Sequence, residues 1–357
     1  MKTKTHRTLF VALTLAALLA ATPAAWALPK IKILATGGTI AGAQASQADA
    51  GYKSGTFSVD DLIKAVPQMT NIAVLSGEQV ANIGSQTMNH EVWLKLAARC
   101  NELLKQPDVD GIVITHGTDT LEETAYFLSL VLKSDKPVVL VCAMRPATGI
   151  SADGPMNLYN GVALAGNPDA SGRGPLVVNN DTIHYARELQ KMHTTMLNAF
   201  ESPNRGVAGV MNTGRVYFYS KNTTRHTTNS DFSLKGLTVE TLPYVEIVYS
   251  YANFDGKLID AAVAQGAKGI VLAGVGDGNT TDAALEALAR AAKKGVAVVR
   301  CSRTAAGVAD RNIEVDDDKL GFIAGMELNA QKARILLMLA LTKTNDVKKL
   351  QEYFYQY

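Results

Sequence analysis

The sequence contains a series of short apolar runs, rich in β-branched residues, in which polar and apolar residues do not alternate. A strand with one face in water shows such alternation, whereas a strand buried on both faces does not. The first of these runs are residues 31–35, 112–115, 138–142 and 176–178. Stretches with the periodicity of helices, including residues 91–105 and 121–132, lie between several of them. Strands that alternate with helices indicate a parallel sheet covered on both sides.

A second group of apolar runs begins after a polar stretch at residues 221–235. Residues 206–219, just before it, alternate more regularly and contain Asn212-Thr213-Gly214, which favours an antiparallel hairpin. The later runs are 245–249, 270–273 and 296–300, and the later helices are expected at 282–294 and 330–342. The 357 residues suit about two domains. We therefore predict an α/β protein with a parallel-sheet N-terminal domain, a linker and a smaller α/β C-terminal domain, at residues 28–220, 221–243 and 244–357 respectively.

The N-terminal segment has the layout of a secretory signal peptide. Three basic residues among the first seven precede an apolar run at residues 9–21, and Pro23 ends that run. Ala-Trp-Ala at residues 25–27 places small residues at the two positions that a signal peptidase reads. A membrane anchor is the less favoured alternative, because the run is short and no stop-transfer pattern follows. We expect cleavage after Ala27 to remove residues 1–27, and the protein to be periplasmic or secreted.

Composition argues against several other classes of function. The formal net charge is +2, aromatic residues make up 6% of the chain, and no block of basic residues indicates nucleic-acid binding. No long apolar stretch follows the N-terminal segment, so no membrane association is expected after signal cleavage. Cys100, Cys142 and Cys301 are too few and too scattered for a disulfide framework or a zinc site, although a pairing of two of them stays open. Cys142 is expected to be a buried small hydrophobe, and neither a metal nor an organic cofactor is expected.

Polar segments that directly follow the predicted strands are candidate sites, because ligands bind beyond the carboxyl ends of strands in an open parallel sheet. Thr36-Gly37-Gly38-Thr39 follows the first strand, and its paired glycines allow a tight turn and a close approach of the backbone. The segment lacks the spacing of a dinucleotide-binding loop and the lysine of a P-loop. Taken alone, it is explained as well by a plain turn as by a site around Thr39.

The six residues at 115–120, Thr-His-Gly-Thr-Asp-Thr, follow the second strand. They bring three hydroxyls and a carboxylate to the point where a strand leads into a helix. The alternative is that Thr118 or Asp119 caps the helix that begins near Glu122, but capping needs only one such residue. His116 receives no role in this interpretation.

Two further strand-end segments carry weaker signals. Ser85 and Gln86 supply a hydroxyl and an amide, which suit a zwitterionic small molecule, but a helix N-terminus leading to Asn89 is the favoured explanation of this segment alone. Residues 273–279 contain three alternating glycines before a helix. Such a loop either holds a phosphate at a helix N-terminus or forms a flexible turn.

Taken together, these segments resemble those of one enzyme family. Residues 35–42 and 115–120 closely resemble the two signature segments of bacterial L-asparaginases, in the same order and at strand ends. Further matching segments are residues 143–146, 151–155, 274–276 and 328–334. The resemblance covers almost the whole chain after the signal segment, which itself is similar to that of the exported type II branch. It implies hydrolysis of L-asparagine to L-aspartate and ammonia.

The resemblance implies two groups of catalytic residues. Thr39 corresponds to the nucleophile that attacks the side-chain amide carbon and forms an acyl-enzyme. Tyr52 corresponds to the tyrosine of a lid beside that threonine, and the Gly-, Ala- and Ser-rich composition of residues 43–55 predicts a mobile loop. Glu314 corresponds to the acid that pairs with the tyrosine. The second group is a polar triad of Thr118, Asp119 and Lys191.

The resemblance also implies a substrate-binding set and a subunit arrangement. Ser85, Gln86 and Asp119 correspond to the groups that hold the carboxylate and ammonium ends of the substrate, and the carbonyl of Ala143 would face its amide. Asn279 and Glu314 correspond to residues that this family inserts into a neighbouring subunit's site. A homotetramer of tight dimers with shared active sites is implied. Gln86 and Asn279 resemble asparaginases rather than strong glutaminases, so glutamine is expected to be a minor substrate.

The chemistry leaves the identity of the general base open. A threonine hydroxyl is a weak nucleophile that must lose its proton as it attacks. A tyrosine is a poor base until a neighbour relays the proton onward, which gives the pairing of Tyr52 with Glu314 a purpose. Thr118 and Lys191 are expected to polarise groups and orient water rather than to form a second nucleophile–base pair. Direct attack by water is the alternative mechanism.

A periplasmic binding protein for a polar amino acid is the alternative from another class. Two α/β domains and a signal peptide suit such a protein, but it would not need Thr39 and Thr118 together. Two positions depart from the family pattern, since Cys142 and Ala186 stand where glycine is common. The side chain of Cys142 is expected to point into the sheet.

Overall fold

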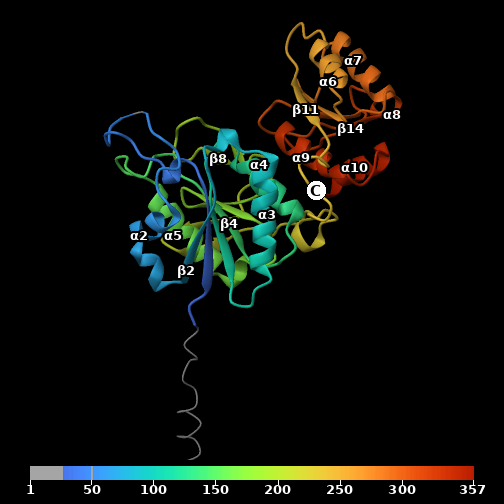
Figure 1. The fold of residues 1–357 in the computed structure, drawn as a ribbon. Helices are drawn as coiled ribbons and strands as arrows, with labels where there is room; N and C mark the ends of the chain where they lie inside the picture. The colour runs from blue at the N-terminus through green and yellow to red at the C-terminus, as the bar shows by residue number, and fades with distance from the viewer. Residues whose placement is uncertain (1–26, 50) are drawn as a thin grey trace, which may run out of the picture.

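The computed structural model describes residues 27–49 and 51–357, so the predicted signal peptide lies outside the described residues apart from Ala27. The described chain forms two α/β units, each with its own sheet (Figure 1). The N-terminal unit contains an eight-stranded sheet and the C-terminal unit a four-stranded sheet. This is the α/β class that the apolar runs predict.

The large sheet is parallel over most of its strands and ends in an antiparallel section. In spatial order its strands are β10 (Arg215–Phe218), β9 (Gly209–Asn212), β6 (Thr182–Tyr185), β5 (Leu176–Asn179), β4 (Val138–Val141), β3 (Gly111–Thr115), β1 (Lys30–Gly37) and β2 (Val74–Ile83). Pairing is parallel from β2 through β1, β3 and β4 to β5. It is antiparallel from β5 through β6 and β9 to β10. The carboxyl ends of five neighbouring strands therefore share one edge of the sheet.

Helices bury both faces of this sheet. They are α2 (Val59–Ala65), α3 (His90–Leu104), α4 (Leu121–Val131) and α5 (Gly154–Ala165), with short 3-10 turns η1 (Thr39–Ala41), η2 (Pro67–Asn71), η3 (Ser85–Thr87) and η4 (Pro168–Ala170). Successive residues of β3 enter different cores: Ile112 and Ile114 pack in the core with α3 and α4, whereas Val113 packs in the core with α5. A strand buried on both faces has no polar face to present, which explains the uninterrupted apolar runs.

The antiparallel section confirms the predicted hairpin. Asn212 of β9 pairs with Arg215 of β10, so Thr213 and Gly214 form a two-residue connection. Both have positive φ angles, 48° and 81°. Connections of this kind match the twist of the strands that they join, and glycine accepts such angles without a Cβ clash.

The C-terminal unit contains a parallel sheet with helices around it. Its strands are β11 (Val245–Tyr249), β12 (Gly269–Gly274), β13 (Ala297–Ser302) and β14 (Phe322–Ala324), paired in that order and all parallel. Its helices are α6 (Lys257–Ala264), α7 (Asp282–Lys293), α8 (Asp317–Leu320), α9 (Ala330–Ala340) and α10 (Val347–Gln356). Helix α7 ends beside Gly295, whose φ of 83° is the left-handed conformation with which glycine commonly ends helices.

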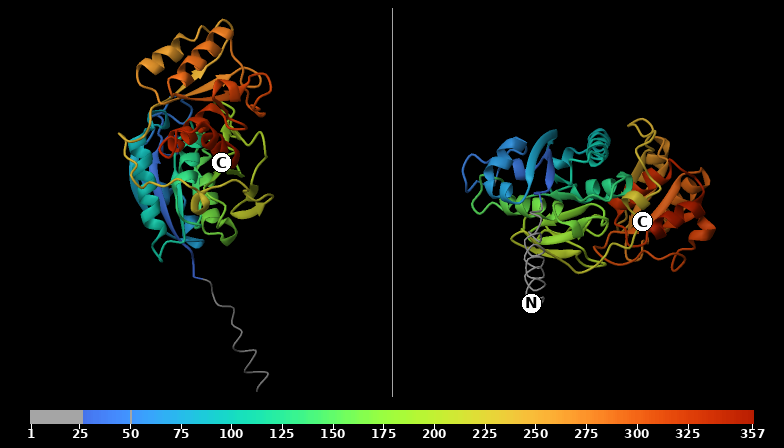
Figure 2. Two further views of the ribbon diagram at one scale, coloured as in Figure 1. Left: turned by 90° about the vertical axis from the view of Figure 1, so that its right-hand side faces the viewer. Right: turned by 90° about the horizontal axis from the view of Figure 1, so that it is seen from below.

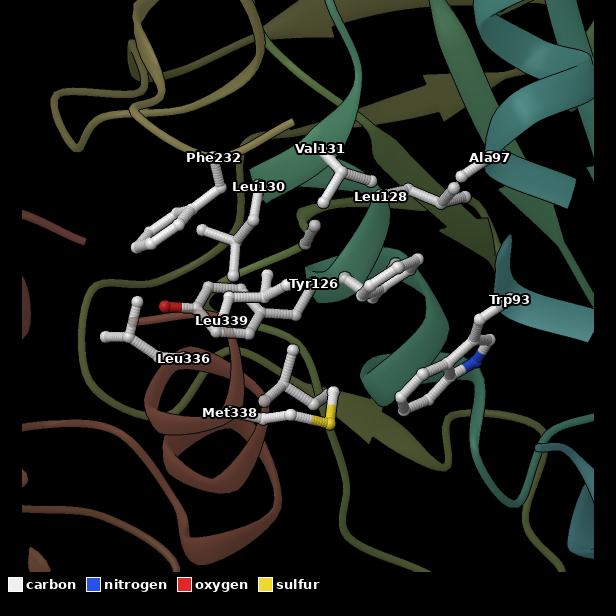
Figure 3. Packing of buried hydrophobic residues seen from close by; sticks show 14 of the residues in the cluster. Trp93, Ala97, Tyr126, Leu128, Leu130, Val131, Phe232, Leu336, Met338 and Leu339 are labelled. Atoms are coloured by element: carbon white, nitrogen blue, oxygen red, sulfur yellow. The ribbon is translucent and has the colours of Figure 1, made fainter. Parts of the chain in front are cut away.

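Helices α4 and α9 join the two units through a shared core (Figure 3). Tyr126 and Leu130 of α4 lie with Leu336 and Leu339 of α9 in one buried cluster, which also takes in Phe232 from the segment between the units. Each large apolar side chain buried there contributes about 2 kcal/mol. The two views of Figure 2 show the units side by side, with α9 and α10 at the junction.

Three details complete the comparison with the sequence. The patterns read from the sequence give no range for several observed elements, among them α2, α5, α6, α8, α10, β2, β6, β14, η5 (Thr227–Asn229) and the two-stranded ribbon of β7 (Gln190–Lys191) and β8 (Phe200–Glu201). The three cysteines are all buried and free, so no pair among them forms a disulfide, and Cys142 lies in the core as expected. Within the described residues, every helix is too short or too polar to cross a membrane.

Candidate active site

The loops after β1, β2 and β3 meet at the carboxyl edge of the large sheet. These strands are neighbours, with β1 in the middle, so the segments that follow them lie beside one another. The loop after β1 carries Thr39, the loop after β2 carries Ser85, and the loop after β3 carries Thr118 and Asp119. Four of the residues expected in the site thus come from three adjacent strand ends.

Glycines allow these loops to touch backbone to backbone. A Cβ at Gly38 would lie 2.4 Å from the Cα of Gly117, and Gly38 has a φ of 84°. A Cβ at Gly117 would lie 2.6 Å from the hydroxyl oxygen of Ser85. No side chain fits at either position unless the loops separate. Gly38 therefore fixes how closely the loop of Thr39 approaches the loop of Thr118, and Gly117 fixes how closely the latter loop approaches Ser85.

Thr39 and Tyr52 form one pair of hydroxyl groups. Their oxygens are 2.7 Å apart, and either can donate the hydrogen bond. Thr39 is buried in the turn η1, whereas Tyr52 is 45% exposed. The loop that carries Tyr52 is closed at its base by two hydrogen bonds between Ala43 and Lys53, of 3.0 and 2.9 Å. The tyrosine is thus held over the threonine by a loop that stays largely open to solvent.

Lys191 joins the two polar residues of the loop after β3. Its ammonium donates to the hydroxyl oxygen of Thr118 at 2.8 Å and to the carboxylate of Asp119 at 2.7 Å. The ribbon of β7 and β8 holds Lys191 in place, opposite Phe200. Because an ammonium group only donates, the oxygen of Thr118 acts as an acceptor here. The Thr118 hydroxyl in turn donates to the carboxylate of Asp119 over 3.5 Å, a long hydrogen bond that a ligand or a water molecule can replace.

Ser85 is bonded directly to the same loop. The backbone N–H of Asp119 donates to its hydroxyl oxygen at 3.0 Å, and the Thr120 hydroxyl donates to its carbonyl oxygen at 2.8 Å. Gln86 is exposed beside it. A cavity of about 350 Å³ lies next to these groups and is lined by Asp119, Lys191, Met192, His193 and Thr194.

The capping explanation for Thr118 and Asp119 is wrong. Thr120 is the residue that precedes α4, and no side chain caps that helix. The start of α3 is capped instead by Asn89, whose side-chain oxygen accepts from the N–H of Val92 at 3.0 Å. Ser85 is therefore not needed as a cap. These polar side chains are free for a site.

His116 is a structural residue within the same loop. Trp93 donates to the Thr124 hydroxyl at 2.8 Å, that hydroxyl lies 2.9 Å from Nε2 of His116, and Nδ1 of His116 lies 2.7 Å from the carbonyl oxygen of Gly117. The roles are complementary when the neutral imidazole carries its proton on Nδ1. Burial lowers the pKa of His116 to about 4. The ring therefore braces the loop as a neutral group.

Ala143 follows β4 and is fully buried. The loop around it is held by Asp153, whose carboxylate accepts from the N–H groups of Met144 and Arg145, both at 2.9 Å. Asn157 donates to the carbonyl oxygen of Cys142 at 2.9 Å. The cysteine at a position where glycine is common is accommodated, because its side chain points into the core.

Asn279 and Glu314 lie in the C-terminal unit, on two loops beyond the sheet of β11 to β14. The amide of Asn279 donates to the carboxylate of Glu314. The loop of Tyr52 projects from the opposite side of the N-terminal unit (Figures 1 and 2). Within the described part of one chain, no hydrogen bond joins Tyr52 to Glu314. The structure thus brings Thr39, Tyr52, Ser85, Thr118, Asp119 and Lys191 to one edge and leaves Asn279 and Glu314 apart.

A buried ion pair behind the site was missed in the sequence. Lys332 of α9 donates to the carbonyl oxygen of Leu189, two residues before Lys191, and lies 3.7 Å from Glu122 of α4. Burial raises the pKa of Glu122, against the opposing effects of Lys332, Asn329 and the backbone amide of Lys191. Burial likewise lowers the pKa of Lys332. The available signal was Lys332 on the same helix as the long apolar run Ile335 to Ala340.

The comparisons with known proteins cover both units of the chain. The family model described as "Asparaginase, N-terminal" matches residues 30–224, and "Glutaminase/Asparaginase C-terminal domain" matches residues 244–354. The chain is 54% identical to "L-asparaginase 2" of Bacillus subtilis, over 92% of this chain and 87% of that protein. It is 52% identical to "Probable L-asparaginase periplasmic" of Haemophilus influenzae, over 92% and 93%.

Two further matches extend this picture. A "Glutaminase-asparaginase" of Pseudomonas fluorescens is 48% identical over 92% of this chain and 91% of that protein. The crystal structure of a "Probable Cytoplasmic L-asparaginase" from Campylobacter jejuni matches with a TM-score of 0.89 and 51% identity, over 92% of this chain and all of that one. With two family models side by side and relatives above half identity along nearly their whole length, this chain belongs to the asparaginase family.

Proposed function

We propose that this protein is an L-asparaginase that hydrolyses the side-chain amide of L-asparagine to L-aspartate and ammonia. The observation that carries the proposal is that two threonine hydroxyls lie at adjacent strand ends, each with its own polar partners. Thr39 is hydrogen-bonded to Tyr52, and Thr118 accepts from Lys191, which also binds Asp119. The relatives' names, L-asparaginase and glutaminase-asparaginase, support this reaction and a glutaminase side activity. Nothing in the comparisons supports an amino-acid-binding protein.

Thr39 is the nucleophile in this proposal. Its oxygen attacks the amide carbon, and its proton passes to Tyr52, whose oxygen is 2.7 Å away. Delivery of a proton from Tyr52 to the amide nitrogen lets the C–N bond break and ammonia leave, which gives an ester between Thr39 and the aspartyl group. Water then hydrolyses the ester to L-aspartate and restores the Thr39 hydroxyl. The separation is within the reach required of a proton acceptor. Glu314 of a neighbouring subunit would relay the proton from Tyr52.

Thr118, Lys191 and Asp119 act as a polarising group. Lys191 donates to the oxygen of Thr118 and so strengthens the Thr118 hydroxyl as a donor to the substrate or to water. Asp119 supplies the negative charge that faces the substrate's ammonium, while Ser85 and Gln86 face its carboxylate. Ala143 offers its carbonyl to the substrate amide. We infer that asparagine is preferred over glutamine.

We infer a homotetramer of tight dimers in which neighbouring subunits share sites. The support is that Asn279 follows β12 and Glu314 precedes α8, so both belong to the C-terminal unit, whereas Tyr52 lies on a loop of the N-terminal unit. Cleavage of the signal peptide after Ala27 and export to the periplasm complete the proposal. The name of the Haemophilus relative supports this location.

The direct test is ammonia release from L-asparagine by the purified protein and by two variants. Thr39→Ala removes the nucleophile and should lower kcat by roughly 10³-fold or more. Thr39→Ser keeps a hydroxyl and should retain measurable turnover and an acyl-enzyme. An inactive wild-type protein would refute the proposed reaction. A Thr39→Ala variant as active as the wild type would refute the proposed nucleophile alone.

A further inference from the structure

The loops that carry Asn279 and Glu314 form a small exposed tip on the C-terminal unit. We call residues 275–279 and 310–317 the two-loop tip. The first loop is a tight turn closed by two hydrogen bonds between Val275 and Asn279, each of 2.8 Å. The second loop leads into the short helix α8, and Glu314 at its crest is exposed. Neither loop belongs to a sheet, so other contacts must fix their relative position.

Arg300 of β13 lies directly beneath the tip and contacts both loops. Its Nη1 donates to the carbonyl oxygens of Asp277 and Gly278 at 2.9 and 3.3 Å, and its Nη2 donates to the carbonyl oxygen of Asp310 at 2.9 Å. The first two acceptors belong to the loop of Asn279 and the third to the loop of Glu314. One planar group thus joins the two loops.

Asp317 holds the guanidinium in that orientation. Its carboxylate accepts from Nε and Nη2 of Arg300 at 2.7 and 2.8 Å, and also from the N–H of Asn312 at 2.9 Å. Arg300 is 1% exposed and Asp317 is 0% exposed. Five hydrogen bonds therefore satisfy all five donors of the guanidinium in a site without solvent.

The tip is also adapted to the arginine. Gly278 has a φ of 75°, and a Cβ there would lie 3.2 Å from Nη1 of Arg300. Asp277 reinforces the bridge from the solvent side, since its carboxylate accepts from the N–H of Asp310 at 2.7 Å. Besides the hydrogen bond from Asn279 to Glu314, two further links thus join the loops, one buried and one near the surface.

We propose that the Arg300–Asp317 pair positions Asn279 and Glu314 as one rigid unit for the active site of the neighbouring subunit. The inference rests on the proposed function, in which those two residues complete a partner's site. Arg300 is then a positioning residue that acts across the subunit boundary, although it touches no substrate. A buried ion pair is a weak source of net stability, whereas a fork of five donors gives geometric precision.

The first test compares kcat and KM for two variants and one control. Arg300→Lys keeps a positive charge beside Asp317 but cannot reach acceptors on both loops, so kcat/KM should fall by about 10- to 100-fold. Asp277→Ala removes only the surface link and should lower kcat/KM by about threefold. Arg290→Lys, in an exposed ion pair on α7, is the matched control and should leave kcat/KM unchanged.

The second test uses hybrid oligomers. In these hybrids, an effect of Arg300 on the folding of its own subunit and an effect on the site of the neighbouring subunit give different activities. Differently tagged Thr39→Ala and Arg300→Lys subunits are co-expressed and their hybrids purified. In a mixed dimer, the Arg300→Lys subunit supplies an intact Thr39 and the Thr39→Ala subunit an intact tip. The site that combines this Thr39 with this tip should then turn over with the kcat/KM of the wild type. A hybrid of wild type with Thr39→Ala, which also has one active site, gives the reference activity.

The outcomes are distinct. Hybrids no more active than the mean of their parents would show that Arg300 acts within its own subunit, and wild-type kcat/KM in the Arg300→Lys homo-oligomer would refute any positioning role. If Arg300→Lys does not fold, the same hybrid is made with Asp277→Ala, which changes a side chain near the surface. Failure of the proposed function itself would appear separately, as a wild-type protein that releases no ammonia from L-asparagine.

Discussion

The residues of the site differ in how they are held. Thr39 and Ser85 are buried in turns and bonded to neighbouring backbone, whereas Tyr52 and Gln86 stand on exposed segments. His116 explains part of this rigidity, because it is sealed between Thr124 and the carbonyl of Gly117. Thr39 and Ser85 are thus held inside the protein, whereas Tyr52 and Gln86 remain accessible to solvent.

The buried histidine makes stability depend on pH. The pKa of His116 is about 4 in the folded protein, against 6.5 for a free histidine. Between these two pH values this histidine is protonated in the unfolded chain but neutral in the folded chain. Stability should therefore fall as the pH drops from about 6.5 to 4, by at most about 3 kcal/mol from this residue. His184, also lowered to about 4 by burial, should add a similar dependence.

Urea unfolding of the wild type and of His116→Asn across this pH range measures the effect. Asparagine cannot titrate but can still donate to the carbonyl of Gly117. The unfolding free energy of His116→Asn should therefore depend less on pH than that of the wild type. His193→Asn replaces an exposed histidine and serves as the control. Parallel pH curves for His116→Asn and the wild type would contradict the prediction.

At the scale of elements, the strands and helices that build the site follow from the sequence. Strands buried on both faces, such as β3, have to be continuously apolar, and the polar residues that end them mark the edge where ligands bind. β2 is not continuously apolar, because it lies at the edge of the sheet and most of its residues are exposed or partly exposed. The pattern of a buried strand therefore does not identify it. β7 is only two residues long, so its position depends on β8 and on the fold around it rather than on local pattern.

Helices α4 and α9 meet at the buried pair of Glu122 and Lys332, which should couple stability to the position of Lys191. Lys332→Met leaves the carboxylate buried without its partner and should destabilise the protein by about 3–5 kcal/mol. Glu122→Gln in the same chain should restore part of that loss, because the unpaired charge is removed. The double-mutant cycle is measured by urea unfolding, with kcat as a second readout. Additive single effects would show that the two residues do not act as a pair.

At the scale of the whole molecule, the described chain carries two separate sets of expected site residues. One set lies at the edge of the large sheet in the N-terminal unit, and the other, Asn279 and Glu314, lies on the two-loop tip of the C-terminal unit. In the N-terminal set, Thr39, Ser85, Thr118 and Asp119 could be singled out as polar residues at strand ends, whereas Tyr52 and Lys191 follow only from the resemblance to the family. The tip was not predictable in the same way, because Arg300, Asp277 and Asp317 are brought together only by the fold of the C-terminal unit. Contacts between residues on different loops leave no periodic trace in a sequence.

A shared site predicts that turnover depends on subunit association. Specific activity should fall on dilution in parallel with the loss of dimers, because a separated subunit lacks Asn279 and Glu314 at its own Tyr52. Ammonia release and sedimentation velocity, measured over the same concentration series, test this. Separated subunits with full specific activity would show that each chain contains a complete site.

The contact between Gly38 and Gly117 has a consequence for any effort to change substrate preference. The main chain, rather than side chains, sets the distance between the loops of Thr39 and Thr118. Mutant libraries should leave these two positions constant, since almost any replacement would separate the loops and remove activity whatever the substrate. Substitutions at Gln86 and along the loop of Tyr52 change exposed side chains without changing the distance between the loops of Thr39 and Thr118. Libraries that seek activity on new amide substrates should therefore vary these positions.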